Sequence, residues 1–195
     1  MNFERMRHSA RAWLFHFCGR NERARAEYAR CFRAWPDAKV ARVLGCLDSD
    51  AGRHDEGARW FAAAVELDPG DAETWFNLGF ARERTGAFAE AAAAFAEAVR
   101  LKPALDRAWY GLALAHAARG DHAAAASALE ETVRLQPLHG EAWYRLGMAQ
   151  HYAGQAQRVG EVVRKLASFE PKFANQLIAD SGRDDLAHLK TELPF

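Results

Sequence analysis

The chain has 195 residues, of which 50% are hydrophobic and 27% are charged. A chain of this length forms one domain or two small ones with a buried core, and this composition is too apolar for a disordered protein. Its 26 basic and 26 acidic residues cancel, which argues against a protein built mainly to hold nucleic acid. Abundant alanine and only six prolines favour helices over sheets.

Signals for membranes and export are weak in this sequence. The longest uncharged stretch near a tryptophan, residues 108–118, is far shorter than the roughly 20 apolar residues of a spanning helix. The arginines near the N-terminus precede only a short apolar stretch without a small-residue cleavage site. Cys18, Cys31 and Cys46 lack CxxC spacing and predict buried free thiols in a reducing compartment. We therefore expect a cytoplasmic protein with no membrane partner.

Several residue types recur at a fixed spacing of 34 residues. Tryptophan, leucine, glycine and proline each form such a column, in which one residue type returns in successive copies. The columns contain Trp75, Trp109 and Trp143; Leu44, Leu78, Leu112 and Leu146; Gly52, Gly86, Gly120 and Gly154; and Pro69, Pro103, Pro137 and Pro171. A period of this length indicates a solenoid of stacked units.

Each copy has the pattern of two helices joined by a turn. In the second copy, Trp75 and Leu78 fall on one face of a helix, and we expect that face to be buried. Gly86 ends this helix with a chain reversal that needs positive φ. The apolar stripe over residues 88–98 predicts a second helix, and Pro103 ends it because the residue before proline avoids the helical region.

Small residues occupy the positions where the two helices of a copy meet. Gly79 in the first helix and Ala91 in the second allow the helix axes to approach closely. Bulkier residues at these positions should overpack the contact.

This pattern resembles the tetratricopeptide repeat. The columns of that family are met in the second copy by Trp75, Leu78, Gly79, Gly86, Ala91, Phe95, Ala98 and Pro103. The clear copies span residues 38–171, about two-thirds of the chain. The resemblance implies an all-α fold, a right-handed α-solenoid of helix-turn-helix repeats with capping helices.

The chain then divides in order into an N-terminal cap, four repeats and a C-terminal cap. Residues 1–37 fit a degenerate helical hairpin. The four repeats occupy approximately residues 38–71, 72–105, 106–139 and 140–173. Residues 172–195 predict one or two short helices that cover the last core edge, with a break at Ser181 and Gly182.

The copies also depart from the family pattern. The tyrosine column of the family's first helix holds Asp48, Arg82, His116 and Gln150 in this chain. Gly160 lies inside the second helix of the fourth copy, where glycine costs about 1 kcal/mol relative to alanine. We expect that helix to be the least stable of the array.

No catalytic, cofactor or metal motif stands out in the sequence. GxGxxG, Walker, GxSxG and HExxH patterns are absent. A nucleophile made of Cys46 and His54 would need a tertiary contact, and a packed thiol near a surface histidine is the favoured interpretation. Asp48 and Asp50 are best explained as a solvated helix end. The sequence therefore predicts a protein that is not an enzyme, with no cofactor and no metal.

A second arc of the first helices carries the candidate partner-binding residues. In the family that this chain resembles, the first helices line the concave surface that takes a peptide or helical ligand. The expected apolar strip contains Phe76, Phe80, Tyr110, Leu114, Tyr144, Met148 and Tyr152, and its margin carries Arg42, Arg84, Arg107 and Arg145. Aromatic residues and arginine anchor interfaces, and methionine adapts to irregular ligands. The alternative is that these aromatics only pack between neighbouring helices.

A carboxylate clamp is a narrower hypothesis for the same surface. Chaperone-binding members of the family grip a C-terminal carboxylate with basic and asparagine side chains. Asn77 matches one clamp column, and Arg42 and Arg107 are basic replacements in two others. Cys46 and Gly111 occupy columns that would need asparagine and arginine, so the match is incomplete.

The sequence thus predicts a protein-interaction module, a scaffold, adaptor or partner-specific chaperone with a protein or peptide ligand. Self-assembly is an alternative, in which one end of the chain fills the groove of a second copy. RNA or an acidic partner is a further alternative, because residues 1–33 carry eight arginines and three glutamates. A solvated arginine-rich helix face explains those charges more simply, which disfavours nucleic acid as the partner.

Overall fold

The computed structural model describes residues 3–190, with side chains from residue 7 onward. Within this range the chain forms eleven α-helices and one 3-10 helix, with no strand. The expected all-α fold of helix-turn-helix repeats is therefore confirmed. The chain divides into two compact units, Met1–Lys102 and Pro103–Phe195, which we call unit 1 and unit 2.

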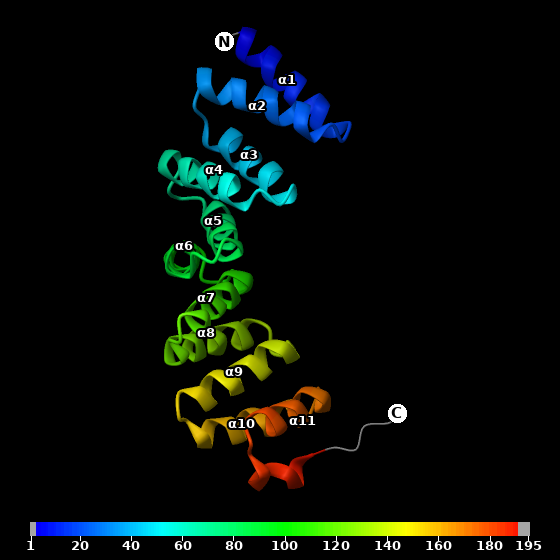
Figure 1. The fold of residues 1–195 in the computed structure, drawn as a ribbon, viewed down its shortest axis with the longest axis vertical. Helices are drawn as coiled ribbons and strands as arrows, with labels where there is room; N and C mark the ends of the chain where they lie inside the picture. Colours follow the sequence, from blue (N-terminus) through cyan, green and yellow to red (C-terminus); the bar gives the residue numbers. More distant parts are fainter. Residues whose placement is uncertain (1–2, 191–195) are drawn as a thin grey trace. The chain divides into compact units, whose positions relative to one another are not determined.

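Unit 1 consists of three consecutive helical hairpins, α1/α2, α3/α4 and α5/α6 (Figure 1). Within the unit, α2 also packs on α3, and α4 packs on α5. The six helices are α1 (Phe3–Phe17), α2 (Asn21–Ala34), α3 (Ala38–Asp50), α4 (His54–Leu67), α5 (Ala72–Arg84) and α6 (Phe88–Leu101).

Unit 2 begins with two more hairpins, α7/α8 and α9/α10. Its last α-helix, α11, packs on both α9 and α10, and η1 then packs on α10 and α11. The elements are α7 (Asp106–Ala118), α8 (His122–Leu135), α9 (Gly140–Tyr152), α10 (Ala156–Ala167), α11 (Pro171–Asp180) and the 3-10 helix η1 (Asp184–Leu189). Gly182, with a φ of 63°, separates α11 from η1, which confirms the expected break.

None of the helices in the described range 3–190 has the length and apolar character needed to cross a membrane.

The turn after each first helix depends on a glycine, as the repeat columns predict. Gly86 adopts a φ of 79° between α5 and α6. This left-handed conformation is open to glycine and strained for residues with a Cβ atom.

The contact inside the hairpins pairs a glycine with an aromatic ring. A Cβ atom on Gly79 would lie 2.7 Å from Phe95 Cδ1, and one on Gly45 would lie 2.6 Å from Phe61 Cε1. Both rings are almost completely buried. The expectation that small residues bring the two helices together is confirmed at Gly79, and the ring fills the space that a side chain there would need.

The repeat columns contribute unequally to the core. The four column leucines, Leu44, Leu78, Leu112 and Leu146, are all buried. The column tryptophans are only half-buried, so the expectation of a buried face holds in full for the leucines and only in part for the tryptophans. Each indole N–H instead donates to a proline carbonyl six residues earlier, for example from Trp109 Nε1 to Pro103 O at 2.9 Å. The tryptophans therefore fasten the loop that precedes each hairpin.

Asp48 is completely buried, so its interpretation as part of a solvated helix end is wrong. Its Oδ1 accepts hydrogen bonds from Arg25 Nε at 2.6 Å and Arg53 Nε at 2.7 Å. Its Oδ2 accepts one from Trp60 Nε1 at 3.0 Å. Charged donors and an indole thus replace the water that the carboxylate gives up, which is what a buried charge requires.

The cysteines also differ from expectation. Cys31 is buried and Cys46 is half-buried, but Cys18 is exposed at the end of α1, and all three are free thiols. The prediction of three buried thiols is therefore wrong for Cys18.

Gly160 in α10 differs from the hairpin glycines because space surrounds it. A Cβ atom there would meet nothing nearer than Leu186 Cδ2 at 3.8 Å, which is ordinary van der Waals distance. Gly160→Ala should therefore raise the free energy of unfolding by about 1 kcal/mol, since alanine is the better helix former. Denaturant unfolding measures this change.

Gly147→Ala in α9 is the matched comparison, because a Cβ atom there would lie 2.3 Å from Leu177 Cδ2. We expect it to lower the free energy of unfolding by about 1–3 kcal/mol through overpacking. Equal effects of the two variants would contradict this account of α10.

Candidate functional site

The candidate partner-binding residues fall in both units, and each unit has a pocket that contains some of them. The unit 1 pocket has a volume of about 250 Å³ and lies among α3, α4 and α5. It is lined by Cys46, Ser49, Asp50, Phe61, Phe76, Asn77 and Phe80. Three predicted residues, Phe76, Asn77 and Phe80, are thus brought together.

Apolar surface dominates the unit 1 pocket. Phe80 is 44% exposed, and the ring of Phe76 lies 5.8 Å from that of buried Phe95. Burial raises the pKa of the Cys46 thiol, Asp50 raises it further, and Arg42 opposes both. A raised pKa keeps the thiol protonated, whereas a catalytic cysteine needs a lowered one. Because its surface is mainly apolar and the thiol is uncharged, the pocket is suited to contact with apolar groups.

Arg42 lies outside the lining of the unit 1 pocket and is engaged in a structural ion pair. Its Nη1 donates to Asp71 Oδ2 at 3.1 Å. Asp71 is the N-cap residue of α5, and it also accepts from Glu73 N at 3.1 Å and Thr74 Oγ1 at 2.7 Å. A carboxylate ligand on Arg42 would have to compete with Asp71. Arg84 is exposed near the end of α5 and does not line the pocket.

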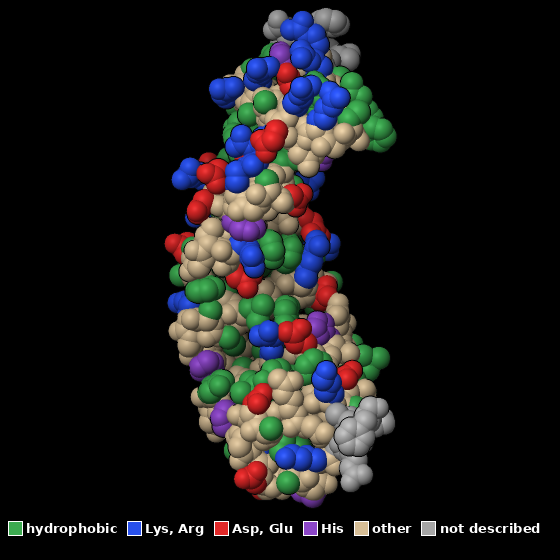
Figure 2. Space-filling model, turned by 45° about the vertical axis from the view of Figure 1, so that its right-hand side comes forward, with side chains coloured by type: hydrophobic (Ala, Val, Ile, Leu, Met, Phe, Trp, Pro, Cys, Tyr) green, Lys and Arg blue, Asp and Glu red, His purple; other side chains and the backbone are tan. Residues whose placement is uncertain are grey.

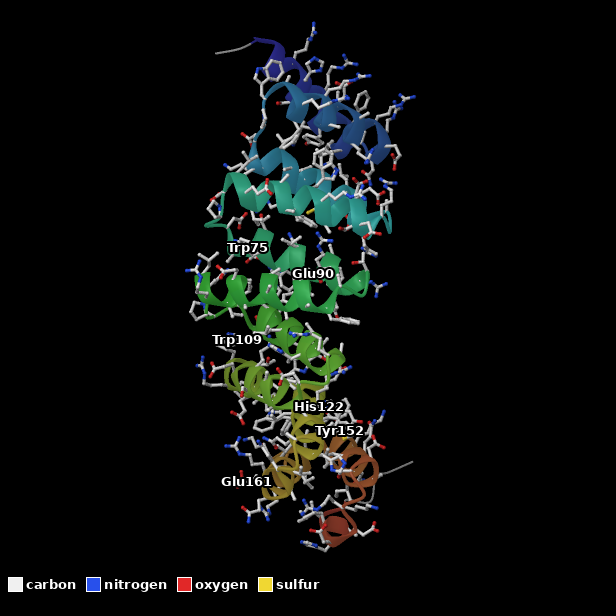
Figure 3. All side chains as sticks on the ribbon, turned by 60° about the vertical axis from the view of Figure 1, so that its left-hand side comes forward. Trp75, Glu90, Trp109, His122, Tyr152 and Glu161 are labelled. Carbon is white, nitrogen blue, oxygen red and sulfur yellow. The ribbon has the colours of Figure 1, made fainter. Side chains whose placement is uncertain are left out.

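The unit 2 pocket has a volume of about 350 Å³ and lies among α7, α8 and α9. Five predicted residues line it, namely Leu114, Tyr144, Arg145, Met148 and Tyr152, together with Ala113, Ala117, His122, Leu129 and Ala149. Tyr152 is 61% exposed, and its ring lies 4.9 Å from that of His122. Figure 3 shows these two side chains together on one side of unit 2.

Tyr144 is tied to the C-terminal helix. Its hydroxyl donates to Asp180 Oδ2 of α11 at 2.7 Å, and its ring lies 5.9 Å from that of Phe173. Burial raises the pKa of Tyr144, and the hydrogen bond to Asp180 raises it further. One edge of the unit 2 pocket is therefore fixed by α11.

Tyr110 and Arg107 do not line the unit 2 pocket. The guanidinium of Arg145 lies 5.9 Å from the centroid of the Tyr110 ring, and the ring of His139 stacks on Tyr110 at 5.5 Å. Glu141 Oε1 holds Arg145 in place by accepting from Nε at 3.0 Å and Nη2 at 2.8 Å. Burial raises the pKa of Tyr110. Tyr110 is thus covered by its own neighbours.

Three of the pocket residues that the sequence did not identify come from second helices. Phe61 belongs to α4, and His122 and Leu129 belong to α8. Phe61 packs against Gly45 of the first helix of its hairpin, and His122 lies at the start of α8 beside Tyr152. The periodic pattern places Phe61 and Leu129 in the core. It does not distinguish a core residue that also lines a pocket from one that is only buried.

The N-terminal arginines serve partly as partners for buried acids. Glu27 is 3% exposed, with His8 Nδ1 at 3.0 Å, Arg30 Nη1 at 2.9 Å and Arg11 Nη2 at 3.5 Å from its carboxylate. Arg25 pairs with Asp48 as described above. Figure 2 shows Lys and Arg side chains gathered over the α1/α2 hairpin. Part of the local positive charge is therefore paired with carboxylates of the chain itself.

Among the residues that the structure describes, no group of three or more His, Cys, Asp and Glu side chains is placed to hold a metal ion.

Paired helices repeated at a fixed period define this chain as a helical-repeat protein. Family models described as tetratricopeptide repeat match residues 42–106 and residues 106–149. The chain therefore belongs to the tetratricopeptide repeat family, whose members generally serve as protein-interaction modules. No curated protein sequence matches the chain.

Several solved structures share this fold. A crystal structure of MamA protein has a TM-score of 0.78 and 22% identity, and the match covers 100% of both chains. YrrB, described as a TPR protein with an unusual peptide-binding site, has a TM-score of 0.77 and 19% identity, with 90% of each chain covered. A MamA fragment from Desulfovibrio magneticus RS-1, residue 41 to the end, has a TM-score of 0.74 and 18% identity, covering 88% of this chain and 98% of that one. These identities establish a common fold alone.

The environment of Glu27 predicts a pH-dependent stability. The hydrogen bond with His8 lowers the pKa of Glu27, burial opposes the shift, and Arg11 and Arg30 lower the pKa further. A carboxyl group with a lowered pKa stabilises the folded state above its unfolded pKa of about 4.3, and this contribution is lost as the pH falls through the folded value. Glu27→Gln should therefore be less stable than the wild type at neutral pH, and the difference should shrink below about pH 4.

Thermal unfolding of the two proteins from neutral to acidic pH measures this difference. A gap between them that stays constant into acid would contradict the charge-based account of Glu27.

Proposed function

We propose that this chain is a non-catalytic scaffold, adaptor or partner-specific chaperone that binds a peptide or an amphipathic helix along the exposed face of its first helices. The observation that carries the proposal is the unit 2 pocket, where Leu114, Met148 and Tyr152 are accessible. The column leucines of the same helices, Leu112 and Leu146, are buried in the core. Each first helix thus divides its apolar residues between the core and an open surface.

The chemistry of the unit 2 pocket fits an apolar side chain of a ligand. Apolar atoms of Leu114, Met148 and Leu129 form its walls, and the ring of Tyr152 offers a partly exposed edge. A thioether adapts its shape to different side chains, and a tyrosine supplies apolar area together with a hydroxyl. An amphipathic helix would insert one or two apolar residues here. Contacts of this kind commonly give affinities near micromolar, about −8 kcal/mol.

The unit 1 pocket supplies a second set of anchors. Phe76 and Phe80 offer ring surface, and Asn77 between them carries an amide that can both donate to and accept from a peptide backbone. This combination of apolar rings with one amide suits a peptide ligand whose backbone N–H and C=O groups need hydrogen-bond partners. The likeness of fold to YrrB, which is described as having a peptide-binding site, is consistent with a peptide ligand.

The cytoplasm is the compartment that we propose for this chain. Its three thiols are free, and the exposed Cys18 would be prone to oxidation in an oxidising compartment.

Self-assembly is a second candidate function, and one observation favours it. Trp13, Leu14 and Phe17 on α1 are 60%, 52% and 77% exposed, and the rings of Trp13 and Phe17 stack at 5.4 Å. Exposed apolar patches on soluble proteins mark interaction sites. A molar mass that rises with protein concentration, and no longer does so in Trp13→Ala/Phe17→Ala, would support this alternative. A monomer at high concentration would exclude it.

Peptides selected on the full chain from a displayed random library test the proposed function. Their affinity, measured by calorimetry, should fall about tenfold or more in Met148→Ala and Tyr152→Ala if they bind unit 2, or in Phe80→Ala if they bind unit 1. Each loss corresponds to about 1.4 kcal/mol of buried apolar contact. These side chains are partly accessible, so folding should be retained.

Ser127→Ala is the matched control, since Ser127 is exposed on α8 and lies outside the lining of the unit 2 pocket. Peptide affinities that are unchanged in all three pocket variants would contradict the proposed function.

A further inference from the structure

Unit 2 contains another pocket, on the side of α9 that faces away from Tyr152. It lies between the second helices α8 and α10 and has a volume of about 490 Å³, which is within the range of about 300–1,000 Å³ typical of ligand sites. Val133, Trp143, Leu146, Gln150 and Val162 form its inner surface. In Figure 3, Glu161 at its rim lies on the opposite side of unit 2 from His122 and Tyr152. We call it the α8–α10 pocket.

Gln150 supplies an unsatisfied polar atom in this pocket. The residue is 3% exposed, and within the described part of the chain its Oε1 has no hydrogen-bond partner. A buried acceptor without a donor destabilises the folded state, because it has lost its hydrogen bonds to water. Because Gln150 lines an open pocket, a ligand that donates a hydrogen bond would satisfy this acceptor once the amide turns toward the pocket.

In the first repeat, an aromatic hydrogen-bond donor occupies the position that Val162 has in the fourth repeat. Asp48 and Trp60 precede Gln150 and Val162 by three 34-residue steps, so the pairs occupy the same columns. In the first repeat, Trp60 Nε1 donates to Asp48 Oδ2 at 3.0 Å. The chain thus contains an internal example of an indole that is hydrogen-bonded to the side chain in the column of Asp48 and Gln150.

A second ring completes the example. The ring of Phe32 packs edge-on against Trp60 with a centroid distance of 5.3 Å. Phe32 is the twelfth residue of α2, and the twelfth residue of the equally long α8 is Val133. Two aromatic rings, Trp60 of the first repeat and Phe32 of the preceding hairpin, are therefore replaced by two valines around the α8–α10 pocket. The open volume lies where these two elements carry an indole and a phenyl ring.

We propose that the α8–α10 pocket binds an indole ring whose N–H donates to Gln150 Oε1. Val133, Leu146 and Val162 would contact the ring faces, as apolar walls contact a buried aromatic. This assignment is independent of the peptide-binding function proposed above, because it uses α8, α10 and the opposite side of α9.

The rim of the pocket indicates what accompanies the ring. Three cationic side chains line the pocket, Arg134, Arg158 and Lys165, against two carboxylates, Glu130 and Glu161. Arg158 donates to Glu130 at 2.7 Å and Arg134 donates to Glu131 at 2.9 Å, so within the described residues Lys165 is the lining cation that has no ion pair. A carboxylate beside the indole would find a partner there. The ligand class is therefore an indole with a neighbouring carboxylate, either a free indole acid or a tryptophan next to an acidic residue.

Calorimetric titration of the full chain with indole-3-acetate and benzothiophene-3-acetate tests the proposal. The two probes have nearly the same shape, but benzothiophene lacks the N–H donor. We expect the indole acid to bind about tenfold more tightly, and we expect Gln150→Leu to remove this preference while keeping the apolar contact. Peptides containing Trp-Asp or Phe-Asp, titrated in parallel, distinguish a protein side chain from a free acid as the natural source.

Val162→Trp provides a second test, because it places the chain's own indole in the column of Trp60. It should abolish binding of both probes, whereas Tyr152→Ala, on the other side of α9, should leave binding unchanged. Circular dichroism measures the folding of each variant. If Val162→Trp does not fold, the loss of the preference for indole in Gln150→Leu is the test of the proposal. Failure of every indole probe to bind the folded wild type, or equal binding of the indole and benzothiophene acids, would overturn the proposal.

Discussion

The contact between a glycine of the first helix and an aromatic ring of the second helix is the constraint on which the α3/α4 and α5/α6 hairpins depend. Phe61 and Phe95 lie so close above Gly45 and Gly79 that a Cβ atom at either glycine would overlap the ring. This contact brings the two helices together and buries both rings. The neighbouring column leucines, among them Leu78, then complete the core.

A first helix held in this way has one face committed to the core and another left for other contacts. In unit 2, α9 shows the consequence most clearly. Leu146 is buried, Met148 and Tyr152 line one pocket, and Gln150 lines another. The direction of the side chains, which follows from the helical period, separates the residues of α9 that line one pocket from those that line the other. The same period that builds the fold therefore distributes its candidate binding residues.

The sequence predicts the elements that repeat and misses those that depend on a single copy. The glycine turn at Gly86 and the buried Leu78 follow from columns that every copy shares. The burial of Asp48 does not, because it requires Arg25 from the preceding hairpin and Trp60 from α4. For the candidate sites, the periodic arc identifies three of the seven residues that line the unit 1 pocket and five of the ten that line the unit 2 pocket. It also includes Tyr110, which Arg145 and His139 cover. The α8–α10 pocket arises where large side chains are missing, and a missing side chain leaves no motif.

Photo-cross-linking tests most directly whether the exposed face of the first helices binds the ligand. A photoreactive phenylalanine derivative replaces Met148 in one variant and Ser127 of α8 in another. Each variant is irradiated together with a peptide that was selected on the wild type and binds unit 2. The account predicts a covalent adduct at position 148 and none at position 127. An adduct at position 127 alone, with the peptide still bound, would contradict it.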